Sequence, residues 1–293
     1  MNTFGFSTTA AEVLAGVDLT GRRALVTGGS SGLGVETARA LASAGADVVV
    51  GVRNLQAGKE VAASIGAEVA HLDLADLDSV RRFAADWAGP LHILVNNAGI
   101  MAVPELTRTP EGRELQFAVN FLGHFALTVG LHDALAAEGA RIVSLSSNAH
   151  LFAPVMLDDL DWHNRPYDPI LAYGESKTAN VLLAVEATRR WSAEGIFANA
   201  VNPVAIATNL QKHTGGLRTP VERRKTVQQG AATSVLVAAS PLLDGIGGRY
   251  YEDCAEAALL TGPPVMFGGG VAPFALDPAI AERLWTRATH LVG

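Results

Sequence analysis

Tyr173 and Lys177 are the two residues whose types and spacing most clearly predict chemistry. They stand four positions apart in a stretch, Tyr173 to Ala193, that we expect to be helical, so both side chains project from one face. A free phenol has a pKa of about 10, which is too high for a base at neutral pH. A neighbouring ammonium favours the tyrosinate, so we expect Lys177 to lower the pKa of Tyr173. The phenol can then exchange a proton with a substrate oxygen near the operating pH.

A glycine-rich turn supplies a second chemical pattern, with the sequence Thr27-Gly28-Gly29-Ser30-Ser31-Gly32-Leu33-Gly34. It lies directly between a predicted strand and a predicted helix. A phosphate can approach a backbone only where side chains are absent, and a helix N-terminus adds free N–H groups and a partial positive charge. The turn therefore predicts a dinucleotide site, and a glycine-rich loop that holds no ligand is the alternative.

The elements that must position these residues follow from the hydrophobic pattern. Short apolar runs predict strands at 24–26, 47–50, 68–72, 92–95, 141–145, 197–201 and 248–251. Longer amphipathic stretches predict helices at 32–44, 76–87, 111–137, 173–193 and 277–291, with Asp76 as an N-cap. Continuous Val, Ile and Leu strands separated by helices indicate a parallel sheet with helices on both faces. We therefore expect an α/β fold, a Rossmann-type doubly wound parallel sheet of about seven strands.

Domain organisation is expected to be simple, because no linker, repeat or composition shift divides the chain. We predict one catalytic domain over 21–293, preceded by an extension, 1–20, packed on the fold. Two irregular regions, about 149–172 and 204–225, follow predicted strand ends. Since open α/β sheets bind ligands at that edge, these regions are predicted to be substrate loops.

Composition limits the partners. The chain has 293 residues, 49% of them hydrophobic, and a formal net charge of −7, which argues against nucleic acid. The single cysteine, Cys254, excludes an internal disulfide and a multi-cysteine metal site, and the eight histidines show no metal-binding pattern. No secretory signal and no run long enough to span a bilayer are visible. We expect a cytoplasmic protein with no metal and no membrane partner.

Five motifs in order resemble the short-chain dehydrogenase/reductase family. They cover about residues 20–210 and comprise the Thr-Gly-x-x-x-Gly-x-Gly turn at Thr27, Asn96-Asn97-Ala98-Gly99, Asn120, Tyr173-x-x-x-Lys177 and Asn202-Pro203. A closer resemblance is to the retinol-dehydrogenase-like branch, including its bacterial members. It is carried by residues 146–150, the long insert before Tyr173 and residues 248–254. The N-terminal membrane anchor of the vertebrate members has no counterpart here.

The resemblance implies a catalytic set of Asn120, Ser147, Tyr173 and Lys177. It implies that Tyr173 exchanges the proton, that Ser147 holds the substrate oxygen, that Lys177 also contacts the nicotinamide ribose, and that Asn120 holds a water linking Lys177 to solvent. Ser146 competes with Ser147, because side chains alternate along a strand and only one of them faces the cofactor. The family pattern takes the second serine. The alternative is that all four are ordinary packing or surface residues.

Cofactor contacts are implied along the same motifs. They are Gly28, Ser30, Ser31, Gly32, Leu33, Gly34, Arg53, Asp73, Leu74, Asn97, Ala98, Gly99, Tyr173, Lys177, Pro203, Val204, Ile206 and Thr208. Arg53 follows the second strand, 19 residues after Gly34, where an arginine accepts the 2′-phosphate of NADP and an acidic residue would hold the ribose of NAD. NADP(H) is therefore favoured over NAD(H), and a solvated Arg53 is the alternative. Asp73 resembles the family's adenine-contacting aspartate, and a helix cap is its alternative.

Val204 departs from the family pattern, which continues Asn-Pro-Gly. A β-branched residue with φ > 0 would be strained. Val204 therefore indicates either an altered backbone or a side chain that fills space beside the nicotinamide. We hypothesise that it narrows the substrate pocket.

The predicted substrate contacts are apolar or aromatic, which suits a hydrophobic ketone, aldehyde or alcohol. They are Ala149, His150, Phe152, Trp162, Tyr167, Val204 and Leu210. Ordinary packing is the alternative for each. We expect NADP(H)-dependent interconversion of such a carbonyl and its alcohol. A reductase of carbon–carbon double bonds and a non-catalytic NADP(H)-binding module remain alternative functions, and a homodimer or homotetramer is an open expectation.

Overall fold

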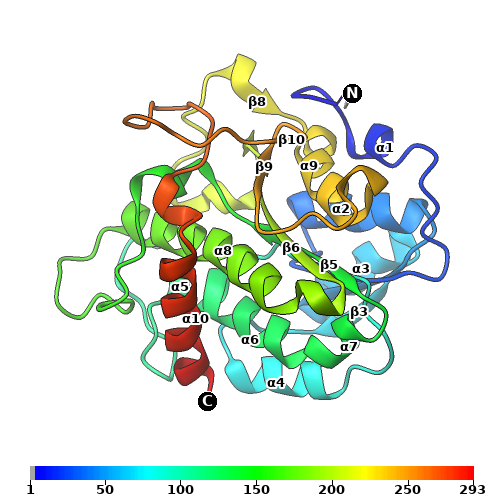
Figure 1. Ribbon diagram of the computed structural model, residues 1–293, viewed down its shortest axis with the longest axis horizontal. Coiled ribbons are helices and arrows are strands. Elements are labelled where there is room, and N and C mark those ends of the chain that lie inside the picture. The colour runs from blue at the N-terminus through cyan, green and yellow to red at the C-terminus, as the bar shows by residue number, and fades with distance from the viewer. Residues whose placement is uncertain (1–3) are drawn as a thin grey trace.

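A mostly parallel eight-stranded sheet forms the centre of the structure, a computed structural model that describes residues 4–293 (Figure 1). The strand order is β10-β9-β6-β5-β4-β1-β2-β3, and only β10 runs antiparallel to its neighbour. The bounds are β1 Arg23–Thr27, β2 Asp47–Val52, β3 Glu68–His71, β4 Ile93–Asn96, β5 Ala140–Leu145, β6 Ile196–Asn202, β9 Tyr250–Glu252 and β10 Ala255–Glu256. A separate parallel pair joins β7 Ala205–Ile206 to β8 Arg224–Lys225.

The expected Rossmann-type fold is confirmed, with eight strands rather than about seven. The extra strand, β10, has only two residues, both exposed, so no apolar run marks it in the sequence. The strand order reverses between β1 and β4. These two strands pair with each other, and Val26 of β1 is one of the paired residues. Such a reversal opens a crevice at the carboxyl ends of the strands, and this is where the glycine-rich turn emerges.

Helices cover both faces of the sheet, over two separate hydrophobic clusters (Figure 1). One face carries α1 Ala10–Val13, α2 Gly32–Ser43, α3 Leu55–Ile65 and α9 Val227–Ala239. The other carries α4 Leu77–Ala85, α5 Leu115–Phe117, η1 Ala118–Leu122, α6 Gly123–Gly130, α7 His132–Ala136, α8 Pro169–Trp191 and α10 Pro278–Val292. Short 3₁₀ turns are η2 Asn148–Phe152, η3 Ser192–Glu194, η4 Asn209–His213, η5 Val221–Arg223, η6 Pro241–Leu243 and η7 Pro273–Ala275.

The N-terminal segment is described from Phe4, so residues 1–3 of the expected extension lie outside the described residues. Helix α1 packs against α9 and α2. Its capping box joins Thr9 to Glu12, with reciprocal hydrogen bonds between side chain and backbone. These contacts hold the described part of the extension on one helical layer.

The single long helix expected over 111–137 is wrong. The side chain of Glu114 accepts hydrogen bonds from the backbone of Gln116 and Phe117, so the helix begins only at Leu115. A π-helical turn, η1, follows and places Asn120 at its centre. A second irregularity at Leu131 separates α6 from α7. The N-cap expected at Asp76 is confirmed, since its carboxylate accepts from the amides of Asp78 and Ser79.

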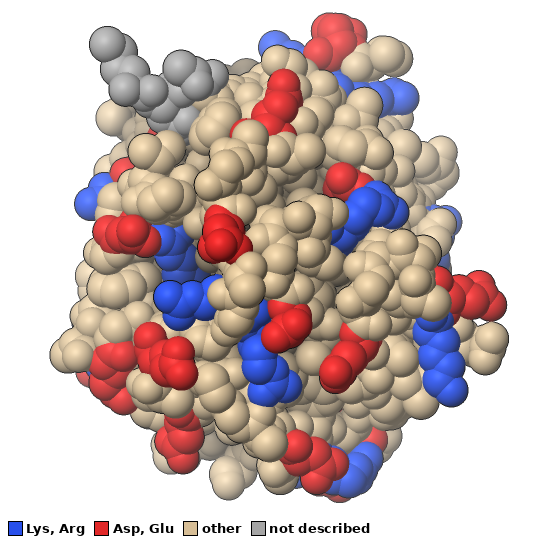
Figure 2. Space-filling view, turned by 90° about the vertical axis from the view of Figure 1, so that its right-hand side faces the viewer, with Lys and Arg blue, Asp and Glu red and all other residues tan. Residues whose placement is uncertain are grey.

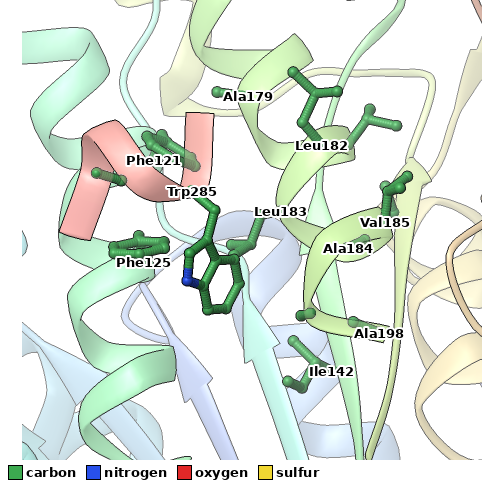
Figure 3. Packing of buried hydrophobic residues seen from close by; sticks show 14 of the residues in the cluster. Phe121, Phe125, Ile142, Ala179, Leu182, Leu183, Ala184, Val185, Ala198 and Trp285 are labelled. Atoms are coloured by element: carbon green, nitrogen blue, oxygen red, sulfur yellow. The ribbon is translucent and has the colours of Figure 1, made fainter. Parts of the chain in front are cut away.

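The C-terminal helix closes the core on one face of the sheet. Figure 3 shows Trp285 of α10 between Phe125 and Leu183. The rings of Phe125 and Trp285 meet edge to face, with centroids 4.9 Å apart. An edge-to-face aromatic pair contributes about 0.5–1.5 kcal/mol beyond the burial of its two rings. Helix α10 therefore packs against α8, which carries Tyr173 and Lys177, and stabilises its position.

The surface mixes charges of both signs. On the face toward the right of Figure 1, acidic and basic side chains are interspersed rather than gathered by sign (Figure 2). Within residues 4–293, no helix combines the length and the apolar content needed to cross a bilayer.

Candidate active site

A large cavity lies at the carboxyl ends of the central strands, where the strand order reverses. Its volume is about 1490 Å³. A single small-molecule site usually occupies roughly 300–1000 Å³, so this cavity has room for two ligands side by side. It is lined by the turns that follow β1, β2, β3, β4, β5 and β6 and by one face of α8.

All the residues predicted to contact a cofactor line this one cavity. They are Gly28, Ser30, Ser31, Gly32, Leu33, Gly34, Arg53, Asp73, Leu74, Asn97, Ala98, Gly99, Tyr173, Lys177, Pro203, Val204, Ile206 and Thr208. Residues far apart in sequence, from five strand ends, thus meet in space. The geometry places them together without showing what each one binds.

The glycine-rich turn leaves the N-terminus of α2 free. Ser31 is the N-cap residue, but its side chain makes no capping hydrogen bond, whereas Asn54, Asp76 and Asp168 cap α3, α4 and α8. The first turn of α2 carries no acidic residue either. Unsatisfied N–H groups and the partial positive charge of the helix therefore face the cavity. This end of α2 fits a diphosphate.

Two glycines in the turn permit close packing of backbone on backbone. Gly28 has φ +70°, and a Cβ atom there would lie 2.9 Å from Cα of Ala98. A Cβ atom on Gly34 would lie 2.6 Å from the carbonyl oxygen of Gly28. Since non-bonded carbons do not approach so closely, a side chain at either position would push the turn away from its neighbours.

Thr27 ties the turn to the loop after β4. Its hydroxyl accepts hydrogen bonds from the amides of Asn97 (2.9 Å) and Ala98 (3.0 Å). The side-chain amide of Asn97 donates to the carbonyl of Thr27 (2.7 Å). Sequence reasoning did not assign Thr27 a role. A threonine that ends a buried strand just before the turn was the available signal.

Tyr173, Lys177 and Ser147 meet on one wall of the cavity. The hydroxyl of Ser147 lies close enough to the phenol of Tyr173 to lower its pKa. The ammonium of Lys177 lies 5.5 Å from the centroid of the Tyr173 ring and donates to the carbonyl of Leu145 (3.0 Å). Ser146 instead donates to the carbonyl of Lys177 (2.8 Å), on the inner side of the strand. The structure thus brings Ser147, and not Ser146, to the phenol.

The direction of the Tyr173 pKa differs from the sequence expectation. Burial raises the pKa of Tyr173 to about 12, and the hydrogen bond from Ser147 opposes this only in part. Burial also lowers the pKa of Lys177 to about 8. Desolvation disfavours the charged form of each group. At neutral pH the phenol is therefore protonated and able to donate.

Asn120 lies behind the cavity wall rather than in its lining. Its side-chain oxygen accepts from the amide of Ile100 (2.8 Å), and its side-chain nitrogen donates to the carbonyl of Ile100 (2.9 Å) and to the hydroxyl of Ser176 (2.9 Å). These bonds occupy both side-chain donors. The side-chain oxygen keeps a second lone pair, so the expected role of holding a water beside Lys177 stays a prediction.

Only some of the predicted substrate residues reach the cavity. Ala149, Phe152, Val204 and Leu210 line it, and His150, Trp162 and Tyr167 do not. Trp162 is buried beneath the guanidinium of Arg165, 3.6 Å from its ring centroid. Sequence reasoning missed four exposed apolar residues in the lining, which are Ile170, Leu171, Met266 and Phe267.

His150 is a core residue in this structure. Its Nδ1 donates to the carbonyl of Ser147 (2.7 Å), and its Nε2 accepts from the amide of Ala272 (3.2 Å). The ring packs against Tyr250 in a tilted arrangement, with centroids 4.7 Å apart. Its placement in a substrate pocket was therefore wrong, because both ring nitrogens already have partners inside the protein.

Stability in mild acid should depend on His150. Burial lowers its pKa from 6.5 to about 4, so the unfolded state binds one more proton than the folded state between these values. Stability is then lost as pH falls from about 6.5 toward 4. When the pH falls from 7 to 5, the unfolding free energy of His150→Gln should decrease by about 2 kcal/mol less than that of the wild type, as measured by urea denaturation. His290→Gln, at an exposed position, is the control. Equal losses in all three proteins would refute this.

Val204 keeps the left-handed backbone that the family pattern reserves for glycine. Its φ is +67°, its amide donates to the side-chain oxygen of Asn202 (3.0 Å), and it lines the cavity. Val204 therefore combines a left-handed backbone with a place in the cavity lining. A β-branched residue in this region is strained, and such strain clusters at functional sites.

Arg53 and Asp73 stand at the far end of the cavity. The side chain of Arg53 is exposed, and no ion pair of Arg53 is found among residues 4–293. Asp73 accepts from the amide of Ala75 (3.0 Å), as in a turn cap, and also lines the cavity. The geometry therefore allows both readings of Asp73.

Glu252 fastens a C-terminal loop to the site, a role that sequence reasoning missed. Its carboxylate accepts from the amide of Gly270 (2.6 Å) and from the side chain of Asn202 (3.2 Å). Asn202 also donates to Asn148 (2.6 Å), which in turn donates to the carbonyl of Gly268 (2.9 Å). Residues 268–270 are thus held against the strand ends. Over the described part of the chain, no cluster of three potential metal ligands occurs.

Comparison with known proteins gives consistent matches. The family model described as short chain dehydrogenase matches residues 22–216. A probable oxidoreductase of Streptomyces lividans is 54% identical, over 92% of this chain and 97% of its own length. Retinol dehydrogenase 13 of Homo sapiens is 35% identical, over 93% of this chain and 85% of its own.

Solved structures agree. The crystal structure of a putative uncharacterized protein from Mycobacterium paratuberculosis is 35% identical and superposes with a TM-score of 0.77, over 98% of this chain and 97% of that one. A putative NAD(P)-dependent gluconate 5-dehydrogenase from Beutenbergia cavernae, solved with bound NADP at low occupancy, is 29% identical with a TM-score of 0.62. That alignment covers 80% of this chain and 95% of the other.

Proposed function

Because the chain belongs to the retinol-dehydrogenase-like branch of the short-chain dehydrogenase/reductase family, and is therefore an oxidoreductase that binds a nicotinamide cofactor, we propose what it does with that cofactor. The proposal is NADP(H)-dependent interconversion of a hydrophobic ketone or aldehyde and its alcohol. The observation that carries it is the meeting of Ser147, Tyr173 and Lys177 on the wall of one cavity, which also holds a free helix N-terminus.

The residues around the turn suit the cofactor. The open N-terminus of α2 would hold the diphosphate, and the loop Asn97–Gly99 would hold the neighbouring ribose. Arg53 supports a preference for NADP(H), since an exposed guanidinium at this position can pair with a 2′-phosphate. When bound, the cofactor supplies or accepts the hydride at the substrate carbon.

Proton transfer belongs to the chain's own residues. Tyr173 carries its proton at neutral pH and would donate it to the substrate oxygen as a carbonyl is reduced. Ser147 would hold that oxygen within reach of the phenol. Lys177 lies on the same helical face as Tyr173, and its ammonium is held by a hydrogen bond to the carbonyl of Leu145. Its positive charge would stabilise the tyrosinate left after proton transfer. Because the pKa of Tyr173 is raised, reduction should be the easier direction near pH 7.

Consumption of NADPH and NADH by the purified protein tests this function. The panel should hold hydrophobic ketones and aldehydes together with α,β-unsaturated carbonyls. We expect oxidation of NADPH with at least one saturated ketone or aldehyde. Turnover only with the unsaturated compounds would favour a reductase of carbon–carbon double bonds. Binding without turnover over the whole panel would favour a non-catalytic module.

The side chain of Val204 should have two effects: it should limit the size of the substrate, and it should lower the unfolding free energy of the protein. Removing its side chain relieves a left-handed strain of about 1–2 kcal/mol, so Val204→Gly should raise the unfolding free energy by about 1 kcal/mol. It should also raise kcat/KM for bulky ketones relative to small ones by about tenfold. Ala205→Gly, at the next residue, should instead lower stability, since its backbone is that of an ordinary strand. Unchanged stability and substrate range in Val204→Gly would contradict this account.

A further inference from the structure

His124 joins the cofactor side of the cavity to the helix that carries Asn120. It lies in the first turn of α6 and is fully buried. Its Nε2 lies 2.8 Å from the hydroxyl oxygen of Thr27, at the end of β1. Its Nδ1 lies 2.9 Å from the main-chain oxygen of Asn120, in the π-helical turn. One ring thus spans two elements that are far apart in sequence.

The hydrogen-bond partners fix the tautomer of His124. The Thr27 hydroxyl already accepts from two amides, those of Asn97 and Ala98, which uses both of its lone pairs. Its one proton must therefore point to His124 Nε2, which is closer than the carbonyl of Val95 at 3.4 Å. The remaining ring proton is on Nδ1 and is donated to Asn120. From the amides of Asn97 and Ala98 to Thr27, His124 and finally Asn120, each group thus donates a hydrogen bond to the next.

That path reaches both halves of the site. At one end, Thr27 holds the loop of Asn97 and Ala98 against the glycine-rich turn. At the other end, the side chain of Asn120 donates to Ser176 (2.9 Å), which lies between Tyr173 and Lys177 on α8. Hydrogen bonds through His124 and Asn120 thus join the glycine-rich turn to α8.

A packing role alone does not require a histidine here. An apolar side chain would fill the space without the desolvation that lowers the pKa of His124 to about 4. The ring is neutral at physiological pH, so it contributes one acceptor and one donor at a fixed separation rather than a charge.

We propose that His124 is a positioning residue that couples occupancy of the glycine-rich turn to the placement of Asn120 and α8. The inference rests on the proposed function, because it requires a nicotinamide cofactor at the turn. A ligand that orders the turn would stabilise Thr27, then the ring of His124, then the π-helical turn. Removing the ring nitrogens should loosen the turn and separate the two halves.

The first test measures the NADPH dissociation constant by fluorescence titration. His124→Leu removes both hydrogen bonds and should raise this constant by about tenfold. His124→Gln retains one donor and one acceptor and should stay within about threefold of the wild type. Thr128→Val is the matched control. It removes a buried hydrogen bond to Asn96 (3.0 Å), one turn further along α6, and should leave NADPH binding unchanged at a similar loss of thermal stability.

The second test measures amide hydrogen exchange over 115–123 with and without NADPH. In the wild type and in His124→Gln, NADPH should slow exchange in this segment. In His124→Leu and in Thr27→Val it should not, although each variant still binds NADPH at a raised concentration. Thr27→Val keeps the shape of the side chain and serves if His124→Leu does not fold.

The outcomes separate this inference from the proposed function. A wild type that binds neither NADPH nor NADH would overturn both. A wild type that binds NADPH, with His124→Leu no weaker than Thr128→Val or with equal protection of 115–123, would overturn the coupling alone. Failure of His124→Gln to restore binding would also overturn it, since hydrogen bonding would then not be the cause.

Discussion

Replacing Tyr173 by Phe is expected to lower kcat/KM for NADPH-dependent carbonyl reduction by about 10²–10⁴-fold, the usual contribution of a positioned general acid. The variant removes only the phenol hydroxyl, which lies near Ser147, and leaves the buried ring in place. Without that proton, the oxygen of the reduced substrate develops charge with only the hydroxyl of Ser147 beside it, and no general acid is left to protonate it. NADPH binding should stay within about threefold of the wild type, because the hydroxyl is needed for chemistry rather than for the turn.

Tyr251→Phe is the control for this prediction. Tyr251 is also buried, but it lies in β9 and does not line the cavity. Removing its hydroxyl should leave kcat/KM within about twofold. If Tyr173→Phe retained most of the activity, another group would have to supply the proton and the proposed roles of Ser147 and Tyr173 would be lost.

Replacing Arg53 by Ala is expected to raise the dissociation constant for NADPH by about 10–100-fold, because a charge-assisted bond to a phosphate contributes about 1.5–3 kcal/mol. Affinity for NADH should change little, since NADH carries no 2′-phosphate. The preference for NADPH over NADH should therefore fall by about the same factor. Isothermal titration of both nucleotides measures the two constants directly.

Lys59→Ala controls for the loss of one positive charge in the same region. Lys59 is exposed on α3, the helix that follows Arg53, and does not line the cavity. Its removal should leave both constants unchanged. Equal weakening of NADPH and NADH in Arg53→Ala would show that the arginine supports the loop rather than a phosphate. The preference for NADP(H) would then have no basis.

Much of the fold could be predicted because buried parallel strands leave a plain pattern. The runs around Leu25, Val49 and Leu94 carry apolar side chains on both faces of the strand, and each run forms an inner strand of the sheet. The long helix over 111–137 failed because its ends and its break depend on tertiary partners. Glu114 caps the helix while its own amide bonds to Asp161, in a different segment of the chain. Hydrophobic periodicity contains no information about such a contact.

The candidate site was likewise predictable from the sequence only in part. Glycine and Tyr-x-x-x-Lys patterns place residues on strand ends and on one helix face, so Gly28, Tyr173 and Lys177 meet as expected. The substrate residues came from an irregular loop, where neighbours in sequence can point to the core or to the cavity. His150 turned inward and Phe152 outward. The pKa of Tyr173 depends on burial, which no spacing in the sequence reveals.

Transfer of deuterium from NADPH labelled at C4 to the product is the most direct measurement of the proposed reaction. The purified protein is incubated with the labelled cofactor and a hydrophobic ketone or aldehyde from the panel, and the product is examined by mass spectrometry and NMR. The account predicts an alcohol that carries the deuterium on its carbinol carbon, formed by the wild type and not by Tyr173→Phe. Deuterium on a carbon of a former carbon–carbon double bond, or no labelled product from any carbonyl, would contradict it.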